Sequence, residues 1–199
     1  PLLLHPDPER VFVIGWGSGG TAGSAGLYPV SAIDCAEIEP AVFAAASFFP
    51  KLNRGIARDP RFRILLSDAR TLLLTGTEKY DVIISEPSNP WVSGMANLFT
   101  DDFYRIAAAR QADDGVFCQW FHYYDLTLAD VKVQIRTFCS RFPEASLWLV
   151  PPRPARQGER AVPIGDILLI GSRRPVTPDW NRISRAYGDP SIAEDLRAG

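Results

Sequence analysis

The sequence predicts an α/β fold whose core is a doubly wound, mostly parallel sheet of seven strands. Apolar runs typical of buried strands alternate with helical patterns along the chain. The first run leads into a glycine-rich loop, and carboxylates stand at the ends of the second and fourth runs. Because ligands of open α/β sheets bind beyond the carboxyl ends of the strands, the same pattern predicts a binding site at that edge.

The strands and helices follow from the apolar pattern in chain order. Strands are expected at 11–15, 30–37, 62–66, 80–86, 115–121, 145–150 and 166–171. Helices are expected between them, near 19–27, 40–48, 68–74, 101–111 and 127–140. Several strands are continuous runs of valine, isoleucine and phenylalanine, as in sheets covered on both faces. Pro40 suits the first turn of the second helix, Thr100 can cap the fourth, and Asp114-Gly115 predicts a turn into the fifth strand.

The last part of the chain changes character. The stretch 151–163 is a loop by composition, and the strands on either side of it are expected to pair antiparallel at the sheet edge. After Ser172 the sequence turns polar, with a short helix expected at 191–197. We therefore expect one catalytic domain over 1–172 and a polar C-terminal extension over 173–199.

Composition narrows the function classes. Hydrophobic residues make up 46% and the net charge is −2, which is ordinary globular composition and gives no electrostatic reason to expect nucleic-acid binding. Cys35, Cys118 and Cys139 lack metal-ligand spacing and are interpreted as buried free thiols in a reducing, cytoplasmic compartment. No apolar run reaches the roughly 18 residues of a membrane span. Because the chain starts at Pro1, we expect it to be a piece of a longer protein.

The glycine loop after the first strand predicts a nucleoside ligand. Gly15, Gly17 and Gly20 fit the G-x-G-x-x-G pattern of nicotinamide enzymes, whereas Gly15, Gly17 and Gly19 fit the G-x-G-x-G pattern of S-adenosylmethionine enzymes. Both patterns need close approach of the backbone to the ligand. The alternative is a tight strand-to-helix turn without a ligand.

Carboxylates after the second and third strands suit the rest of a nucleoside. Glu37 lies 22 residues after Gly15 and can accept hydrogen bonds from both ribose hydroxyls, with Asp34 and Glu39 as competitors. Asp68 follows the third strand, where it can accept from an adenine amino group or cap the next helix, and the two roles are compatible. Asp81 stands at the other end of its strand and is interpreted as structural.

Polar and aromatic residues after the fourth and fifth strands predict a substrate pocket. Glu86 can take a proton from an amine nucleophile, and Asn89 and Trp91 add an amide and an aromatic wall. The alternative is that prolines stiffen this loop and Trp91 only packs. Gln119 and Tyr123 leave the fifth strand toward the same edge, together with Trp120, His122 and Tyr124. His122 is interpreted as a packed residue rather than a base, and no metal site is expected.

Several motifs together resemble those of the spermidine synthase family, whose fold is of the class I methyltransferase (Rossmann-like) type. The resemblance covers about residues 11–150. The motifs are Gly15-Trp-Gly-Ser-Gly-Gly20, Ala36-Glu-Ile-Glu-Pro40, Asp59-Pro-Arg-Phe-Arg-Ile64, Ser67-Asp-Ala-Arg70, Tyr80-Asp-Val-Ile-Ile-Ser-Glu-Pro-Ser-Asn-Pro90, Leu98-Phe-Thr100 and Phe103-Tyr104.

The resemblance implies an activity and a role for each motif. The family transfers an aminopropyl group from decarboxylated S-adenosylmethionine to putrescine or a similar amine, without a metal. Glu86 would stand at the catalytic position that helps to deprotonate the amine. From their positions after the fourth and fifth strands, the residues expected to hold that amine are Asn89, Trp91, Gln119 and Tyr123. The implied residues for the S-adenosyl ligand are Gly15, Gly17, Ser18, Gly19, Glu37, Asp68 and Ala69.

Three departures from the family pattern leave alternatives open. Ser18 replaces a loop aspartate, Glu86 is one methylene longer than the family's residue, and Asn89 replaces a second aspartate. The leading hypothesis is aminopropyl transfer. Methyl transfer from S-adenosylmethionine, a non-catalytic nucleoside-binding domain of a larger protein and a nicotinamide enzyme are the alternatives. We also expect a homodimer, and a membrane-embedded N-terminal part in the parent protein.

Overall fold

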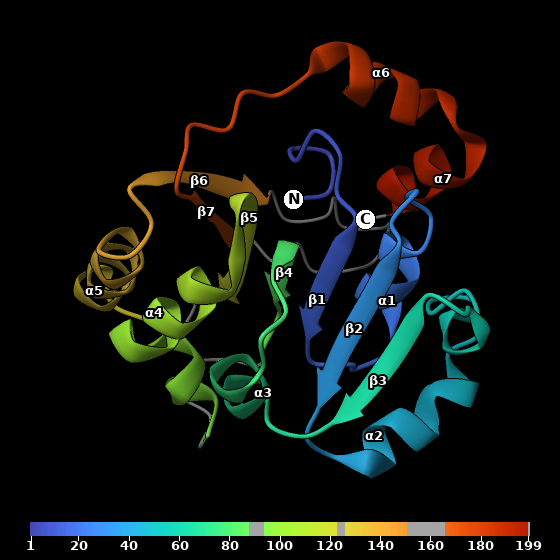
Figure 1. The fold of residues 1–199 in the computed structure, drawn as a ribbon, viewed down its shortest axis with the longest axis horizontal. Coiled ribbons are helices and arrows are strands. Elements are labelled where there is room, and N and C mark those ends of the chain that lie inside the picture. Colours follow the sequence, from blue (N-terminus) through green and yellow to red (C-terminus); the bar gives the residue numbers. More distant parts are fainter. Residues whose placement is uncertain (88–93, 123–125, 151–165, 199) are drawn as a thin grey trace, which may run out of the picture.

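A computed structural model describes residues 1–87, 94–122, 126–150 and 166–198. In these residues seven strands form one sheet in the order β3-β2-β1-β4-β5-β7-β6 (Figure 1). Strands β1 to β5 run parallel, and β7 runs antiparallel to both of its neighbours, β5 and β6. The strands are β1 (Arg10–Ile14), β2 (Ala32–Glu37), β3 (Phe62–Leu66), β4 (Tyr80–Ser85), β5 (Gln111–His122), β6 (Glu144–Val150) and β7 (Asp166–Ser172). The predicted mostly parallel sheet is confirmed, and its antiparallel strand lies one position inside the edge.

Helices connect the strands and end the chain. The helices are α1 (Gly20–Ala25), α2 (Pro40–Ala44), α3 (Ala69–Thr75), α4 (Asp101–Arg110), α5 (Leu128–Cys139), α6 (Trp180–Gly188) and α7 (Pro190–Ala198), with short 3-10 helices η1 (Ala45–Phe48), η2 (Ile56–Arg58) and η3 (Met95–Phe99). The predicted cap is confirmed: the Thr100 hydroxyl accepts a hydrogen bond from the Phe103 backbone N–H, 3.2 Å away, at the start of α4. Thr127 and Asp130 form a capping box that starts α5.

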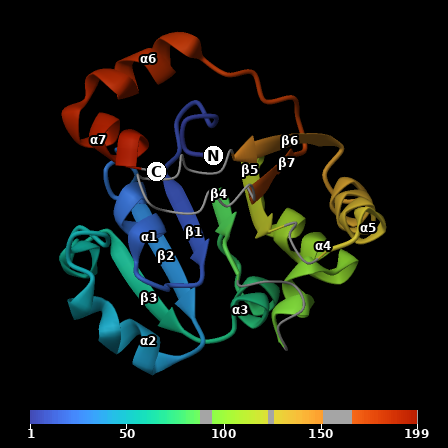
Figure 2. The same cartoon turned by 180° about the vertical axis from the view of Figure 1, so that it is seen from behind.

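The sheet buries apolar side chains on both faces. On one face α3, α4 and α5 cover a cluster of aromatic rings, in which Phe117 stacks on Phe142 with centroids 5.1 Å apart. On the other face α1 and α7 cover a second cluster that contains Trp16 and Ile192. Figure 2, the view from behind, shows this face of the sheet. Burial of both faces explains why β1 and β4, in the middle of the sheet, are nearly continuous apolar runs.

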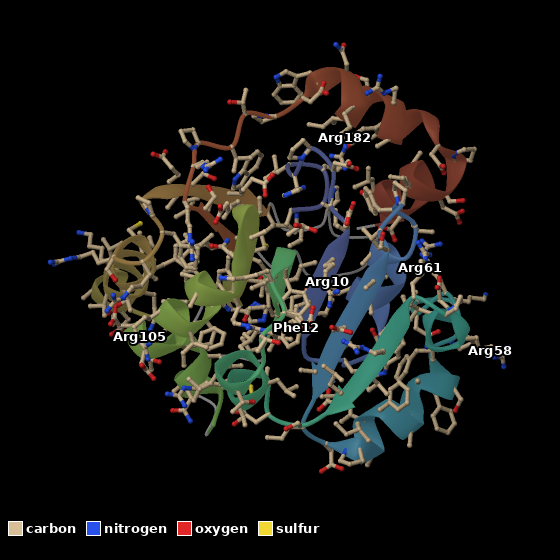
Figure 3. The ribbon with its side chains drawn as sticks, in the orientation of Figure 1. Arg10, Phe12, Arg58, Arg61, Arg105 and Arg182 are labelled. Atoms are coloured by element: carbon tan, nitrogen blue, oxygen red, sulfur yellow. The ribbon has the colours of Figure 1, made fainter. Side chains whose placement is uncertain are left out.

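Asp34 lies inside this sheet and is not a surface residue. Its side chain is 1% exposed. The Arg63 guanidinium donates to both of its carboxylate oxygens at 2.7 Å, and the Tyr80 hydroxyl donates at 2.9 Å. The Tyr80 ring packs on Phe12, which is labelled in Figure 3, with centroids 4.9 Å apart. Burial and the neighbouring Asp34 carboxylate together raise the pKa of Tyr80. The prediction that Asp34 competes for a ligand is therefore wrong, because Arg63 and Tyr80 occupy it.

We expect Asp34→Asn to lower the free energy of unfolding by about 1.5–3 kcal/mol, because it removes charge-assisted hydrogen bonds from a buried site. Midpoints of urea denaturation measure the change. The control is Asp113→Asn, whose carboxylate is 83% exposed and 3.8 Å from the Arg173 guanidinium; it should shift stability by less than about 0.5 kcal/mol. Equal effects of the two substitutions would contradict a structural role for the buried pair.

The two C-terminal helices pack at the amino edge of the sheet, opposite the arrowheads of β1, β2 and β3 in Figure 1. Arg182 of α6, labelled in Figure 3, donates to the backbone carbonyls of Leu2 and Leu3 at 3.0 Å. Asp195 of α7 accepts from Arg54 at 2.9 Å. The predicted short C-terminal helix is confirmed as α7, whereas α6 was not expected. The division into 1–172 and 173–199 stays a prediction.

Two further sequence predictions need correction. The Asp114-Gly115 pair does not precede the fifth strand: β5 already begins at Gln111, and its register with β4 shifts between Tyr80 and Val82. Cys139 is exposed rather than buried. Cys35 and Cys118 are buried as expected, and burial raises the pKa of these two thiols to about 12 and about 11 respectively. Among the described residues, no helix combines the length and hydropathy that a bilayer span requires.

Candidate active site

A cavity of about 820 Å³ opens at the carboxyl ends of β1 to β5. Its volume is within the range of small-molecule sites. Residues that follow β1, β2, β3 and β4 contribute to its wall, and Trp120 contributes from β5. The cavity therefore lies at the edge of the sheet where the sequence predicts a ligand. The predicted site residues that line it are Gly15, Gly17, Ser18, Glu37, Asp68, Ala69 and Glu86.

The glycine loop takes a conformation that only glycine adopts easily. Gly15, Gly17 and Gly19 all have positive φ angles, of 90°, 53° and 80°. Gly19 is not among the residues that line the cavity: it is buried, and a Cβ there would lie 2.4 Å from the ring of Trp16. That ring packs against Phe43 of α2, with centroids 5.1 Å apart. Gly19 thus makes room for the tryptophan that anchors the loop.

Glu37 ties the glycine loop to the turn after β2. Its side chain is 8% exposed. One carboxylate oxygen accepts from the backbone N–H of Trp16 at 3.0 Å, and the other accepts from the backbone N–H of Glu39 at 2.9 Å. Each oxygen retains further acceptor capacity toward the cavity. Glu39, the remaining competitor, is exposed and caps α2 through the N–H of Ala41, 2.9 Å away.

Asp68 caps α3 and also lines the cavity, so its position is compatible with both expected roles. It caps α3, since its Oδ1 accepts from the backbone N–H of Thr71 at 2.7 Å and from the Thr71 hydroxyl at 2.8 Å. It also lines the cavity, together with Ala69. Both capping bonds use Oδ1, so Oδ2 is the oxygen suited to a donor on a ligand.

Glu86 follows β4 and lines the cavity. It is exposed, and its Oε2 accepts a hydrogen bond from the hydroxyl of Thr21 in the first turn of α1. Thr21 also lines the cavity. A carboxylate held in this way can accept a proton through its other oxygen from a group bound in the cavity.

The predicted substrate residues have mixed outcomes. Asn89, Trp91 and Tyr123 lie outside the described residues. Gln119 is fully buried and is not among the residues that line the cavity. Its amide donates to the backbone carbonyls of Ser85 at 3.4 Å and Trp120 at 3.0 Å. Its role toward a substrate stays a prediction.

The cavity wall also contains Thr21, which the sequence did not single out, and Trp120, one of the residues expected to leave the fifth strand toward this edge. Thr21 stands one residue beyond the glycine pattern, and its position in the first helical turn was the available signal. Trp120 follows Gln119, and because neighbouring strand residues face opposite sides of a sheet, the two cannot both face the cavity. His122 packs against Trp120, as expected, but it also lies 2.6 Å from Asp166, measured from Nδ1 to Oδ1.

One group of possible metal ligands occurs in the described part of the chain, away from the cavity. It consists of His5, Asp81 and Asp114. Asp81 accepts from the backbone N–H groups of Glu9 and Arg10 at the head of β4, which confirms its structural interpretation. His5 Nδ1 accepts from the Asp7 backbone N–H, so the neutral ring carries its proton on Nε2. Two of these three side chains are therefore engaged by backbone N–H groups of the chain.

Sequence comparison identifies relatives for most of the chain. The family model described as "Spermine/spermidine synthase domain" matches residues 1–156. A polyamine aminopropyltransferase of Sodalis glossinidius is 34% identical over 119 residues, which is 59% of this chain and 41% of that protein. A spermidine synthase of Dictyostelium discoideum is 30% identical over 141 residues, 70% of this chain and 49% of that protein. The chain thus spans less than half the length of these curated relatives.

Solved structures share the fold at lower identity. A spermidine synthase from Thermotoga maritima superposes with a TM-score of 0.74 at 24% identity, covering 90% of this chain and 58% of that chain. Human methyltransferase-like protein 13, in complex with SAH, superposes with a TM-score of 0.67 at 18% identity, covering 99% of this chain and 86% of that chain. These likenesses show the class I methyltransferase-like fold.

Proposed function

The chain belongs to the spermine/spermidine synthase family, and from this premise we propose that it transfers an aminopropyl group from decarboxylated S-adenosylmethionine to an amine. The observation that carries the proposal is a single cavity with Glu37 at the end of β2 and Glu86 after β4. The first carboxylate suits a ribose and the second suits an amine, so one ligand pair can fit between them. The names of the relatives, polyamine aminopropyltransferase and spermidine synthase, support the same reaction.

The nucleoside is proposed to bind along β1, β2 and β3. Glu37 accepts hydrogen bonds from the ribose hydroxyls, and Asp68 accepts from the adenine amino group beside Ala69. The backbone of Gly15, Gly17 and Ser18 lies against the aliphatic part of the ligand that carries the sulfonium. Gly19 does not contact the ligand but leaves room for the ring of Trp16, which anchors the loop.

The reaction is proposed to be a direct displacement. The amine nitrogen attacks the carbon that joins the aminopropyl group to the sulfonium, so that a C–N bond forms as the C–S bond breaks. The electron pair of the broken bond stays on sulfur, which leaves as a neutral thioether. The proton released from the amine goes to Glu86, whose carboxylate is oriented by the Thr21 hydroxyl.

Calorimetric titration of the 199-residue chain with decarboxylated S-adenosylmethionine and, separately, with S-adenosylmethionine tests the proposal. At least a tenfold preference for the decarboxylated form is expected, equivalent to about 1.4 kcal/mol. Methyl transfer is the second candidate, because Ser18 leaves the loop without a carboxylate that would repel the carboxyl group of S-adenosylmethionine. Preference for that intact form would favour methylation. Tight binding without turnover of any amine would indicate a non-catalytic domain.

We expect Glu37→Gln to weaken binding of the preferred S-adenosyl ligand by about 10–100-fold. The amide keeps the shape of the side chain but has one acceptor oxygen in place of two, so it loses a charge-assisted hydrogen bond to ribose. Calorimetry measures the change. Glu39→Gln is the control, since the Glu39 carboxylate is two residues away and caps α2 outside the cavity wall. The affinity of this variant for the S-adenosyl ligand should stay within about twofold of that of the unsubstituted chain. A similar loss in both variants would contradict the ribose assignment.

Three predictions made from the sequence also belong to the proposal. We propose that the domain acts in the cytoplasm, where buried thiols such as Cys35 stay reduced. We propose that it forms a homodimer, which sedimentation of the purified chain will test. We further propose that the parent protein carries a membrane-embedded part N-terminal to this domain.

A further inference from the structure

Three side chains at the carboxyl end of β5 and the start of β7 contact one another in a line that ends in the cavity. Asp166 Oδ1 lies 2.6 Å from His122 Nδ1. The His122 ring lies against Trp120, with centroids 4.0 Å apart and ring planes at 70°. Trp120 in turn lines the cavity. The carboxylate therefore acts on the cavity wall through the imidazole.

Strand register makes this arrangement rigid. His122 is directly opposite Asp166 in the antiparallel pairing of β5 with β7, so the backbone itself brings the two side chains together. Trp120 and His122 are two residues apart on β5 and therefore face the same side of the sheet. The side chains of His122 and Asp166 are only 18% and 31% exposed. This partial burial strengthens a hydrogen bond to the carboxylate relative to one at the open surface.

The same register places Trp120 beside the proposed base. Ser85, the last residue of β4, is opposite Gln119 of β5, and the residues that follow them in the chain are Glu86, just beyond β4, and Trp120. Both of these residues line the cavity. An amine that gives its proton to Glu86 therefore lies within reach of the indole.

We propose that Trp120 forms the aromatic wall that selects a cationic amine acceptor, and that His122 and Asp166 are positioning residues that fix the orientation of its indole. The inference rests on the proposed aminopropyl transfer and names a determinant of its acceptor. An indole face attracts ammonium groups, and the attraction grows where water is excluded. An indole free to rotate would offer this face only part of the time, which gives the His122–Asp166 pair its function.

The kinetic test uses putrescine as the acceptor. Trp120→Leu should raise the KM for putrescine by about tenfold, and Trp120→Phe by about threefold, since phenylalanine retains a weaker aromatic face. kcat and the affinity for the S-adenosyl ligand should stay within about threefold. Asp166→Asn should also raise the KM for putrescine, although Asp166 does not contact the substrate. Asp166→Glu should bring this KM most of the way back to its value in the unsubstituted chain. A change in kcat alone would contradict a wall for the acceptor.

A spectroscopic test does not depend on turnover. Fluorotryptophan incorporated into the chain gives one ¹⁹F resonance for each of its five tryptophans, and Trp120→Phe identifies the one that belongs to Trp120. Asp166→Asn and His122→Asn should shift or broaden this resonance. The resonance of Trp180, which is 69% exposed on α6, is the control and should not move. Putrescine, added with the S-adenosyl ligand, should shift the Trp120 resonance.

The outcomes separate this inference from the proposed function. Turnover with an unchanged KM in Trp120→Leu and Trp120→Phe overturns the aromatic wall and leaves aminopropyl transfer in place. A Trp120 resonance that responds to putrescine without turnover supports the wall and overturns the transfer reaction. If the chain shows no turnover and putrescine does not shift the Trp120 resonance, both the aromatic wall and the transfer reaction are overturned. A Trp120 resonance unaffected by Asp166→Asn overturns the positioning role.

Discussion

Replacing Glu86 with glutamine is expected to lower kcat by about 10²–10⁴-fold while the affinity for the S-adenosyl ligand stays within about twofold. Glutamine keeps the length of the side chain, and its carbonyl oxygen can still accept the hydrogen bond from Thr21. It cannot take a proton, so the attacking amine loses its base. Single-turnover kinetics with putrescine measure the rate, and calorimetry measures the affinity.

Two further variants separate the loss of the base from a general loss of charge. Glu78→Gln removes a carboxylate that pairs with Arg10 at 2.8 Å, outside the cavity wall, and should leave turnover unchanged. Thr21→Val removes only the hydroxyl that orients Glu86, so its loss should be smaller, and Thr21→Ser should restore most of the rate. Turnover of Glu86→Gln within threefold of the unsubstituted chain would show that another group accepts the proton.

Replacing Phe117 with alanine is expected to lower the free energy of unfolding by about 3–5 kcal/mol. Phe117 is completely buried and stacks on Phe142, with Phe103, Tyr104 and Phe138 around it. Alanine would leave a ring-sized cavity between α4, α5 and the sheet, because rings held from several elements cannot all move inward. For a domain of this size, the loss corresponds to a decrease in Tm of roughly 10 °C.

The control for this prediction is Phe48→Ala. Phe48 lies in η1 and is 81% exposed, so its removal should change stability by less than about 0.5 kcal/mol. Urea denaturation monitored by circular dichroism compares the two variants. A loss below about 1 kcal/mol for Phe117→Ala would mean that the aromatic cluster can rearrange to fill the space, contrary to the packing described above.

The pattern of apolar and polar residues predicts the strands and the residues at their ends, because these depend on local sequence. The third strand was expected at the residues it occupies, Phe62–Leu66, because its apolar run is bounded by polar residues on both sides. The first two carboxylates of the site were also predictable. Glu37 and Asp68 stand where strands end, and in a parallel sheet such ends meet at one edge.

What periodicity misses depends on partners distant in sequence. Asp34 is charged, and only its register opposite Arg63 and its contact with Tyr80 make burial acceptable. The pairing of His122 with Asp166 depends on an antiparallel strand that begins 44 residues later. Gln119 and Trp120 were both expected at this edge, but only one of two neighbouring strand residues can face the cavity, and it is Trp120 that lines it.

The strand order has a consequence for how this domain is made in the cell. β7 is the last strand in the chain, yet it lies between β5 and β6 and is the strand that β6 pairs with. During synthesis at about 5–20 residues per second, β6 therefore waits roughly 1–4 seconds for its partner. Through that interval the unpaired backbone of β6 and the open edge of β5 are available to chaperones or to other nascent chains. A ribosome that pauses just after β6 would lengthen that interval and favour misassembly.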